Sequence, residues 1–101
     1  MKQFIEYRGI IYFNIKMMSK LDLFGKGISS IQYIRNSHDY KEVDLSHNAI
    51  ASLDNIDQFQ NVHLLNISHN HIISGKELIK LKSLKKLRTL LIKGNPFLKS
   101  K

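Results

Sequence analysis

A near-repeat constrains this chain more than any other feature of its sequence. The stretch VDLSHNAI at residues 43–50 and the stretch LNISHNHI at residues 65–72 place apolar residues, a serine, a histidine and an asparagine in the same order, 22 residues apart. A recurrence at a fixed period of roughly 20–50 residues is typical of chains in which no unit can bury its apolar face alone. The repeat therefore predicts a row of similar units, each stacked on the next.

Two further copies extend the pattern in both directions. The copy on the C-terminal side keeps the asparagine, whereas the copy on the N-terminal side has Lys26 in its place. Successive copies are separated by 22, 22 and 25 residues. The equivalent residues are Met18, Leu21, Leu23, Lys26 and Ile28; Tyr40, Val43, Leu45, Asn48 and Ile50; Val62, Leu65, Ile67, Asn70 and Ile72; and Leu87, Leu90, Ile92, Asn95 and Phe97.

Each copy predicts a short strand followed by a turn. Apolar residues two apart, such as Val43 and Leu45, lie on the same side of a strand and enter the core, while the residues between them face outward. The asparagine then falls in the turn, where its amide can satisfy backbone groups that would otherwise be buried without a partner. Lys26 cannot accept such bonds, so its turn is expected to be looser or open to solvent. The predicted structural asparagines are Asn48, Asn70 and Asn95.

Apolar residues recur at every third position after the turns, which predicts return segments of short helix or 3₁₀ turns. This spacing is seen at Ile28, Ile31 and Ile34, and it recurs from Ile50 to Phe59. The interval of 25 residues leaves room for a longer segment. Its stretch Lys76–Lys86, KELIKLKSLKK, is predicted to form a true helix.

The spacing of the copies and the ending LKSLKKLRTLLIKGNPF resemble leucine-rich-repeat proteins. The similarity is to the intracellular subclass with 22-residue units. A regulatory subunit of type-1 protein phosphatase, the A-prime protein of a spliceosomal particle and an axonemal dynein light chain typify it. The resemblance implies an α/β fold, a right-handed solenoid with a concave parallel sheet and helical or 3₁₀ segments on the convex side. We accordingly expect an N-terminal cap over residues 1–17, about four repeats over residues 18–97 and a basic tail over residues 98–101.

The end of the sequence departs from the family pattern. A capping segment usually follows the final Asn-Pro turn in this family, whereas this sequence stops four residues after Phe97. The apolar end of the last unit is therefore expected to be uncovered, so that the isolated chain is marginally stable or self-associates. The alternatives are that the chain is a fragment, that a partner covers this end, or that the tail folds back.

The resemblance also implies a function, because members of the family bind other proteins through the concave sheet. The expected partner-binding residues are those at outward strand positions: Phe24, Glu42, Asp44, Ser46, Leu64, Asn66, Ser68, Leu91 and Lys93. Leu64 and Leu91 fall on adjacent strands, which lie about 4.8 Å apart, and predict an exposed apolar pair beside acidic residues. The alternative interpretation is that these are ordinary surface leucines.

The sequence offers little for catalysis or for metal binding. It contains no cysteine, which excludes disulfides, cysteine zinc sites and thiol nucleophiles, and which favours a reducing compartment. It also lacks a nucleophile elbow and a glycine-rich phosphate loop. Stacked turns could bring His47 and His69 together, but a zinc site needs three or four ligands. We expect a non-enzymatic scaffold or regulatory adaptor without cofactor or metal, cytoplasmic or nuclear, and cytoskeletal or ciliary as a further option.

Positive charge is concentrated in the C-terminal quarter of the chain. The net charge is +8, and residues 76–101 hold nine basic side chains against the single acidic residue Glu77. Phosphate contacts from these side chains would support an alternative function, a basic adaptor associated with RNA or a ribonucleoprotein. The competing interpretation is that the lysines form the solvated face of an outer helix. A membrane partner is not expected, since no uninterrupted apolar stretch approaches the roughly 20 residues that a bilayer requires.

Overall fold

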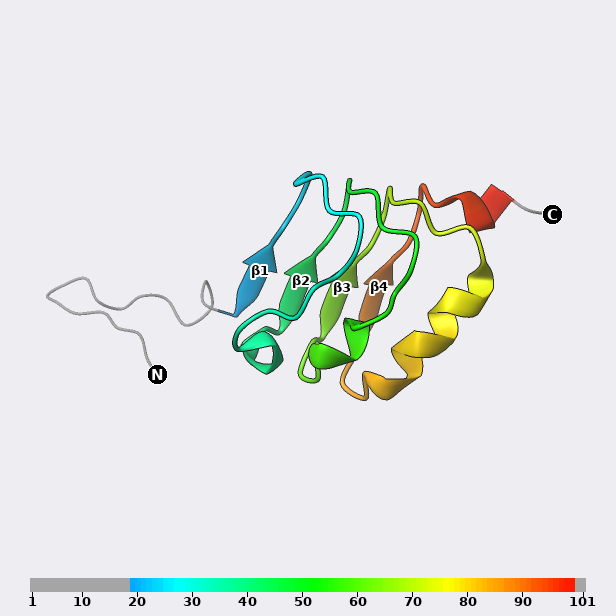
Figure 1. Cartoon of the computed structure of the whole chain (residues 1–101). Coiled ribbons are helices and arrows are strands. Elements are labelled where there is room, and N and C mark those ends of the chain that lie inside the picture. Colours follow the sequence, from blue (N-terminus) through cyan, green and yellow to red (C-terminus); the bar gives the residue numbers. More distant parts are fainter. Residues whose placement is uncertain (1–18, 100–101) are drawn as a thin grey trace, which may run out of the picture.

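The computed structural model describes residues 19–99, which form a four-stranded parallel sheet with its return segments on one side (Figure 1). The strands are β1 (Lys20–Asp22), β2 (Glu42–Asp44), β3 (Leu64–Asn66) and β4 (Thr89–Leu91). Their order in the sheet, β1-β2-β3-β4, is their order along the chain. The predicted α/β class with a parallel sheet is confirmed. The predicted N-terminal cap and the last two residues of the predicted tail lie outside the described residues.

The register of the sheet places equivalent residues of the four copies side by side. Leu21, Val43, Leu65 and Leu90 are direct neighbours across the strands. The residues on either side of this row face away from the core, because side chains alternate along a strand. An apolar residue in the middle of each three-residue strand is therefore enough to build one continuous row of the core.

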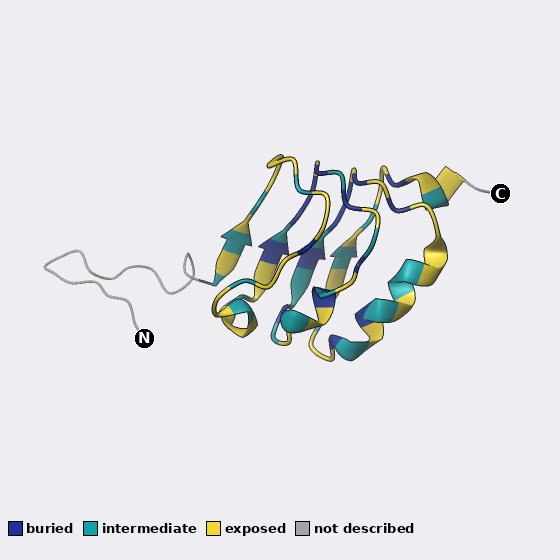
Figure 2. Ribbon diagram, viewed as in Figure 1, coloured by how far each residue is buried: buried dark blue, intermediate teal, exposed yellow. Residues whose placement is uncertain are grey.

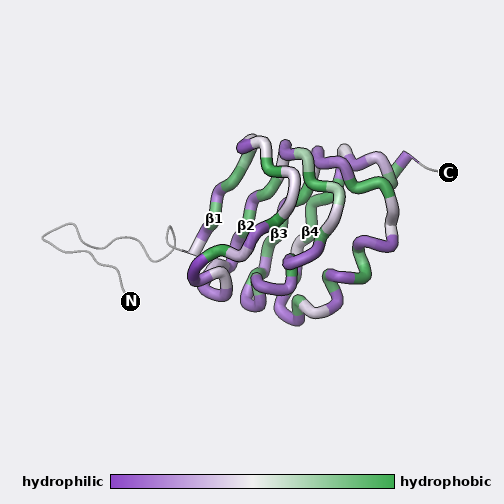
Figure 3. Tube along the Cα trace, viewed as in Figure 1, coloured by the Kyte–Doolittle hydropathy of each residue, from purple (hydrophilic) through white to green (hydrophobic). Residues whose placement is uncertain are grey.

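The return segments are all 3₁₀ helices: η1 (Ser37–Asp39), η2 (Ile56–Gln58), η3 (Gly75–Ser83) and η4 (Pro96–Lys99). The prediction of a true helix over Lys76–Lys86 was wrong in type and in extent, because η3 is a 3₁₀ helix of nine residues. Apolar residues every third position explain this outcome. A 3₁₀ helix has three residues per turn, so such residues align on one side of it. Figure 3 shows hydrophobic and hydrophilic residues alternating along this segment.

The core lies between the sheet and the return segments. Its most deeply buried members come from the second and third copies of the repeat, and burial falls toward β1 and β4 (Figure 2). Leu65 and Ile67 are fully buried, whereas their equivalents Leu90 and Ile92 are only half-buried. The fully buried apolar side chains are Val43, Leu45, Ile50, Leu53, Ile56, Phe59, Val62, Leu65, Ile67 and Ile72.

Three buried asparagines tie each turn to the unit before it. The Asn70 amide donates to the carbonyl oxygens of Leu45, Ile67 and Ser68, and its oxygen accepts from the backbone N–H of Ile50 at 3.0 Å. Asn48 and Asn95 make corresponding bonds to their own turns and to the preceding units. These contacts join equivalent turns along the sheet, because each amide bridges two units.

The turn at Lys26 has no asparagine of its own but is nevertheless held in place. The side chain of Lys26 is exposed, and the residues around it are exposed as well. Its backbone N–H and that of Ile28 both donate to the side-chain oxygen of Asn48, each at 2.9 Å. The expectation of a solvent-open turn agrees with the exposure, but the backbone is bonded to the next unit.

A second set of polar side chains links the return segments to one another. Gln58 accepts a hydrogen bond from the backbone N–H of Ile34 at 2.8 Å, and Glu77 accepts one from that of Leu53 at the same distance. Asn55 donates to the carbonyl oxygen of Ile31. Each bond crosses from one copy of the repeat to the preceding copy, so polar contacts join the units on both sides of the core.

Candidate binding surface

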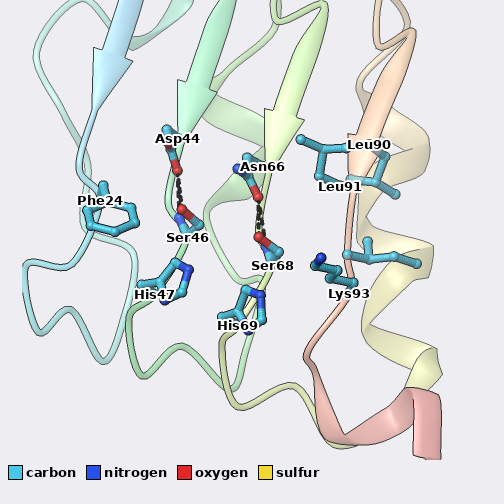
Figure 4. A pocket seen from close by; sticks show the side chains of 11 residues that line it. Phe24, Asp44, Ser46, His47, Asn66, Ser68, His69, Leu90, Leu91 and Lys93 are labelled. Carbon is cyan, nitrogen blue, oxygen red and sulfur yellow. Dashed lines mark hydrogen bonds between the residues drawn. The ribbon is translucent and has the colours of Figure 1, made fainter.

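The outward face of the sheet is the side opposite the return segments, and it carries an open hollow near the C-terminal ends of the strands. Its volume is about 710 Å³. Figure 4 shows its side chains, which come from all four copies of the repeat. The lining residues are Phe24, Asp44, Ser46, His47, Asn66, Ser68, His69, Leu90, Leu91, Ile92 and Lys93. Seven of the predicted partner-binding residues thus meet in one hollow.

Two serines hold the floor of the hollow. The hydroxyl of Ser46 donates to Asp44 at 2.6 Å, and the hydroxyl of Ser68 donates to Asn66 at the same distance. The backbone N–H groups of both serines donate to the same oxygens. Ser46 is only 2% exposed and Ser68 only 7%, so the expectation that they face a partner does not match their burial. They fix the direction in which Asp44 and Asn66 point.

A row of rings forms one rim of the hollow, and the sequence interpretation foresaw that His47 and His69 could meet but not that Phe24 joins them. The imidazoles of His47 and His69 are stacked, with ring centroids 4.4 Å apart, and the ring of Phe24 lies 4.8 Å from that of His47 (Figure 4). The backbone of both histidines is left-handed, with φ near 58° and 54°. The sequence signal for this row of rings is the histidine of the tripeptide Ser-His-Asn, which recurs in the second and third copies. The spacing of these two histidines suggested a metal ligand and not a row of rings.

Gly94 ends this row of rings. Its φ is 80°, and a methyl group at its Cα would overlap with the imidazole of His69. Gly94 therefore provides both the left-handed backbone and the space that the ring occupies. Two stacked imidazoles do not amount to a metal site, and no cluster of three or more potential metal ligands occurs among residues 19–99.

The apolar side chains of the outward face are not arranged as predicted. Leu64 is the first residue of β3 and pairs with Thr89, whereas Leu91 is the third residue of β4 and pairs with Asn66. Leu64 and Leu91 lie on adjacent strands as predicted, but in-register pairing sets them on a diagonal and not directly opposite each other. Leu91 is 43% exposed and Leu64 is half-buried. The exposed apolar groups at the hollow are instead Leu91 on one side and Phe24, 52% exposed, on the other.

Charge is divided along the outward face. Exposed or half-buried carboxylates lie on the first two strands, at Asp22, Glu42 and Asp44. Lys20 pairs in register with Glu42 and offsets part of this charge. Lys93 is exposed at the opposite end of the hollow. A ligand lying across the strands would therefore meet acidic groups at β1 and β2, apolar surface at Phe24 and Leu91, and a cation beyond β4.

On the side of the return segments, carboxylates neutralise part of the positive charge of the basic C-terminal segment. The Lys80 ammonium contacts Asp54 at 2.7 Å and Glu77 at 2.8 Å. The backbone N–H of Leu53 and the Lys80 ammonium hold the pKa of Glu77 below its ordinary value. The hydrogen bond from Lys80 likewise lowers the pKa of Asp54, and the two carboxylates raise the pKa of Lys80. Lys80 therefore links η3 to the segment that precedes η2.

Comparison with known proteins leaves the family open. No protein-family model matches the chain, and no curated protein matches it. In the part of the chain that the structure describes, no helix has the length and apolar character to cross a membrane. The function must therefore be argued from the surface itself.

Proposed function

We propose that this chain is a leucine-rich-repeat module, a short right-handed solenoid that binds another protein on the concave, outward face of its sheet. Four observations support the fold assignment. The strands are parallel and follow chain order, they pair in register, a buried asparagine occupies the turn in three of the four copies, and 3₁₀ segments return the chain along one side. Within this proposal the module is a non-enzymatic scaffold or regulatory adaptor.

One observation carries the proposed function, namely the hollow on the outward face with Phe24 and Leu91 exposed at opposite sides. Large apolar side chains that border a preformed concave surface favour a partner site over scattered exposure. The floor is rigid, because Asp44 and Asn66 are each fixed by a serine hydroxyl and a backbone N–H. A protein partner would gain apolar contacts there without the cost of first ordering the surface.

The test is a comparison of two single substitutions. Leu91→Glu places a charge in the hollow, whereas Ile79→Glu places one on η3, where Ile79 is 61% exposed. We expect affinity purification from the source cell, quantified by mass spectrometry, to recover a partner with the unaltered chain and with Ile79→Glu, and to lose at least about nine-tenths of it with Leu91→Glu. Circular dichroism should show that both variants remain folded. Equal recovery with all three chains would contradict the proposal.

The second candidate is the basic adaptor for RNA or a ribonucleoprotein. Exposed cations at Lys82, Lys85, Lys86 and Arg88 favour it, although Lys80 is taken up by its ion pairs. Binding through phosphate contacts alone would weaken steeply with added salt. Retention on heparin or RNA that is lost at moderate salt would support this candidate, and indifference to both matrices would support the protein-binding module. Within either proposal the compartment is the cytoplasm or the nucleus.

A further inference from the structure

A row of basic side chains lies at the opposite end of the strands from the hollow, and the proposed protein-binding function does not use it. Lys41, His63 and Arg88 each stand one residue before a strand, at equivalent positions in successive copies. The backbone N–H of His63 donates to the carbonyl oxygen of Lys41 at 2.7 Å, and that of Arg88 donates to the carbonyl oxygen of His63 at 2.8 Å. Since neighbouring strands lie about 4.8 Å apart, the three residues are anchored within about 10 Å of one another. We call these three residues the basic row.

Lys86 is a fourth member of the basic row and carries a further positive charge. Its ammonium donates to the side-chain oxygen of Asn61 at 2.8 Å, and the amide of Asn61 donates to the carbonyl oxygen of His38 at 2.7 Å. This chain of contacts holds an otherwise flexible lysine in one place. Less side-chain entropy then remains to be lost when an anion binds, which favours binding.

No acidic group among the described residues balances these charges. The ion pairs found within residues 19–99 are those of Lys80 with Asp54 and Glu77, and a contact between His38 and Asp39. Burial lowers the pKa of His63, and the charges of Arg88, Lys41 and Lys86 lower it further. The described groups that act on the imidazole from both neighbouring copies are thus all cations. The basic row is a concentration of positive potential without a described counter-charge.

We propose that the basic row binds a phosphate monoester, supplied by a phosphorylated serine or threonine of the protein that docks on the outward face. The identity of the carrier rests on the proposed protein-binding function, whereas the anion site itself does not. A phosphate monoester carries about −1.5 to −2 charges at neutral pH and three strong acceptor oxygens. Arg88 offers it a planar fork of donors, and Lys41, Lys86 and a protonated His63 offer further donors.

The structure favours a phosphate monoester over a nucleic-acid backbone. Single-stranded nucleic acid gains much of its affinity from bases stacked on aromatic rings. The aromatic residue next to the basic row, Tyr40, is half-buried and packs against the core instead. The basic row is also compact, because three of its members are fixed by adjacent strands. A compact cluster of cations suits one dianion better than a chain of singly charged phosphates.

The first experiment uses sulfate and the full chain, with His63 followed by NMR. Sulfate is a dianion across the pH range in which histidine titrates, so any pH effect comes from the protein. An anion bound beside the imidazole favours its charged form, and we expect saturating sulfate at constant ionic strength to raise the pKa of His63 by roughly one unit. The exposed His71 serves as the internal control and should shift much less. Equal shifts of both histidines would overturn the proposal.

The second experiment identifies the ligand with three probes, N-acetyl-O-phosphoserine amide, the same compound without phosphate, and a single-stranded oligothymidylate. The variants are Arg88→Gln and, as a control for net charge, Lys82→Gln in η3. We expect Arg88→Gln to weaken binding of the phosphoserine compound at least about fivefold, and Lys82→Gln to leave it nearly unchanged. Equal weakening by both variants would show a nonspecific effect of net charge and overturn the proposal. Tight binding of the oligothymidylate that depends on Arg88 would overturn it in favour of nucleic acid.

These experiments separate the anion site from the proposed docking surface, because neither of them uses the protein partner. Loss of the sulfate effect would end the inference and leave the test at Leu91 untouched. An intact anion site together with full partner recovery by Leu91→Glu would instead refute docking on the outward face. The phosphate monoester would then have to come from another source, and its assignment to a docked partner would be wrong.

Discussion

At the residue scale, a buried asparagine in three of the four turns joins each of these turns to the unit before it. Its amide is a donor and an acceptor at once, so it can satisfy backbone groups of two neighbouring units. The sequence spacing alone placed Asn48, Asn70 and Asn95 in equivalent turns. It could not reveal that Ser46 and Ser68 are buried, because their burial depends on how the chain turns after each strand.

Replacing Asn70 by alanine should lower the free energy of unfolding by about 1 to 3 kcal/mol. The change removes the bond to the backbone N–H of Ile50 and leaves three carbonyl oxygens with one partner fewer. Lys26→Ala should cost almost nothing, because that side chain is exposed and the turn is held through its backbone. Urea denaturation of the two variants provides the measurement. Equal losses would show that the turns do not depend on asparagine.

Gly94→Ala should also destabilise the protein, and for two separable reasons. A left-handed backbone costs a residue with a Cβ atom about 1 to 2 kcal/mol, and the added methyl group would displace the ring of His69. Gly27 is a matched control, since its φ is 71° but no atom lies within 4 Å of the position of an added Cβ.

Comparison of the glycine variants by urea denaturation isolates the contact with His69. We expect Gly94→Ala to cost clearly more than Gly27→Ala. Adding His69→Ala to the Gly94→Ala variant should recover most of this difference, because the ring that the methyl group strikes is then gone. If the double variant is no more stable than Gly94→Ala, the extra loss of stability comes from the backbone conformation and not from the contact with His69.

At the element scale, the return segments show where sequence interpretation failed and why. The pattern of leucines in η3 gave its place correctly, but the length of the segment suggested a true helix. The period of three favours a 3₁₀ helix, since Leu78, Leu81 and Leu84 line up along one side of it, whereas they would drift around an α-helix. Leu81 and Leu84 are buried, and Leu78 is half-buried. The polar links between return segments were not foreseen, because the residue type changes between copies: Glu77 stands 22 residues after Asn55, and each bonds the backbone of the preceding unit.

Glu77 makes the contact between η3 and the segment that precedes η2 dependent on pH. Its pKa lies below the ordinary value of 4.5, first because it accepts a hydrogen bond from Leu53 and second because Lys80 is close. The folded state thus favours the carboxylate. The ionised Glu77 carboxylate contributes its full stabilisation above pH 4.5, which is the pKa of this group in the unfolded chain. This stabilisation is lost as the pH falls through the lower pKa of the folded state.

The substitution Glu77→Gln tests this dependence. It keeps an acceptor for Leu53 but removes the charge facing Lys80, and should cost about 1 kcal/mol at pH 7. The difference from the unaltered chain should shrink as the pH is lowered below 4.5 and vanish below the folded-state pKa. Denaturation midpoints between about pH 3 and pH 7 would show it. Asp57→Asn, which removes an exposed carboxylate of η2, is the control and should change little.

At the scale of the whole molecule, the period of the sequence predicted a row of stacked units, and the resemblance to leucine-rich-repeat proteins implied that their strands run parallel. Units of 22 residues hold a short strand and its return, so each strand lies beside its neighbours in the chain. The details of the outward face did not follow from the period. These details depend on the register of neighbouring strands, as the diagonal placement of Leu64 and Leu91 shows.

Stability should therefore be unequal along the row of strands, and equivalent leucines can measure it. Leu65 in β3 has a strand on each side and is fully buried, whereas Leu90 in β4 is half-buried with β3 as its described neighbour. Leu65→Ala should cost about 3 to 5 kcal/mol, because it removes buried apolar area and leaves a cavity. Leu90→Ala removes less buried area and leaves an opening rather than a closed cavity, so about 1 to 2 kcal/mol is expected.

Chemical denaturation at two protein concentrations would check both values. A cost for Leu90→Ala as large as that for Leu65→Ala would mean that something covers the far side of β4 in solution. Concentration then distinguishes the possibilities. If the cost rises with protein concentration, a second copy of the chain is the cover, as expected for an apolar end that self-associates. If it does not, the cover belongs to the same chain.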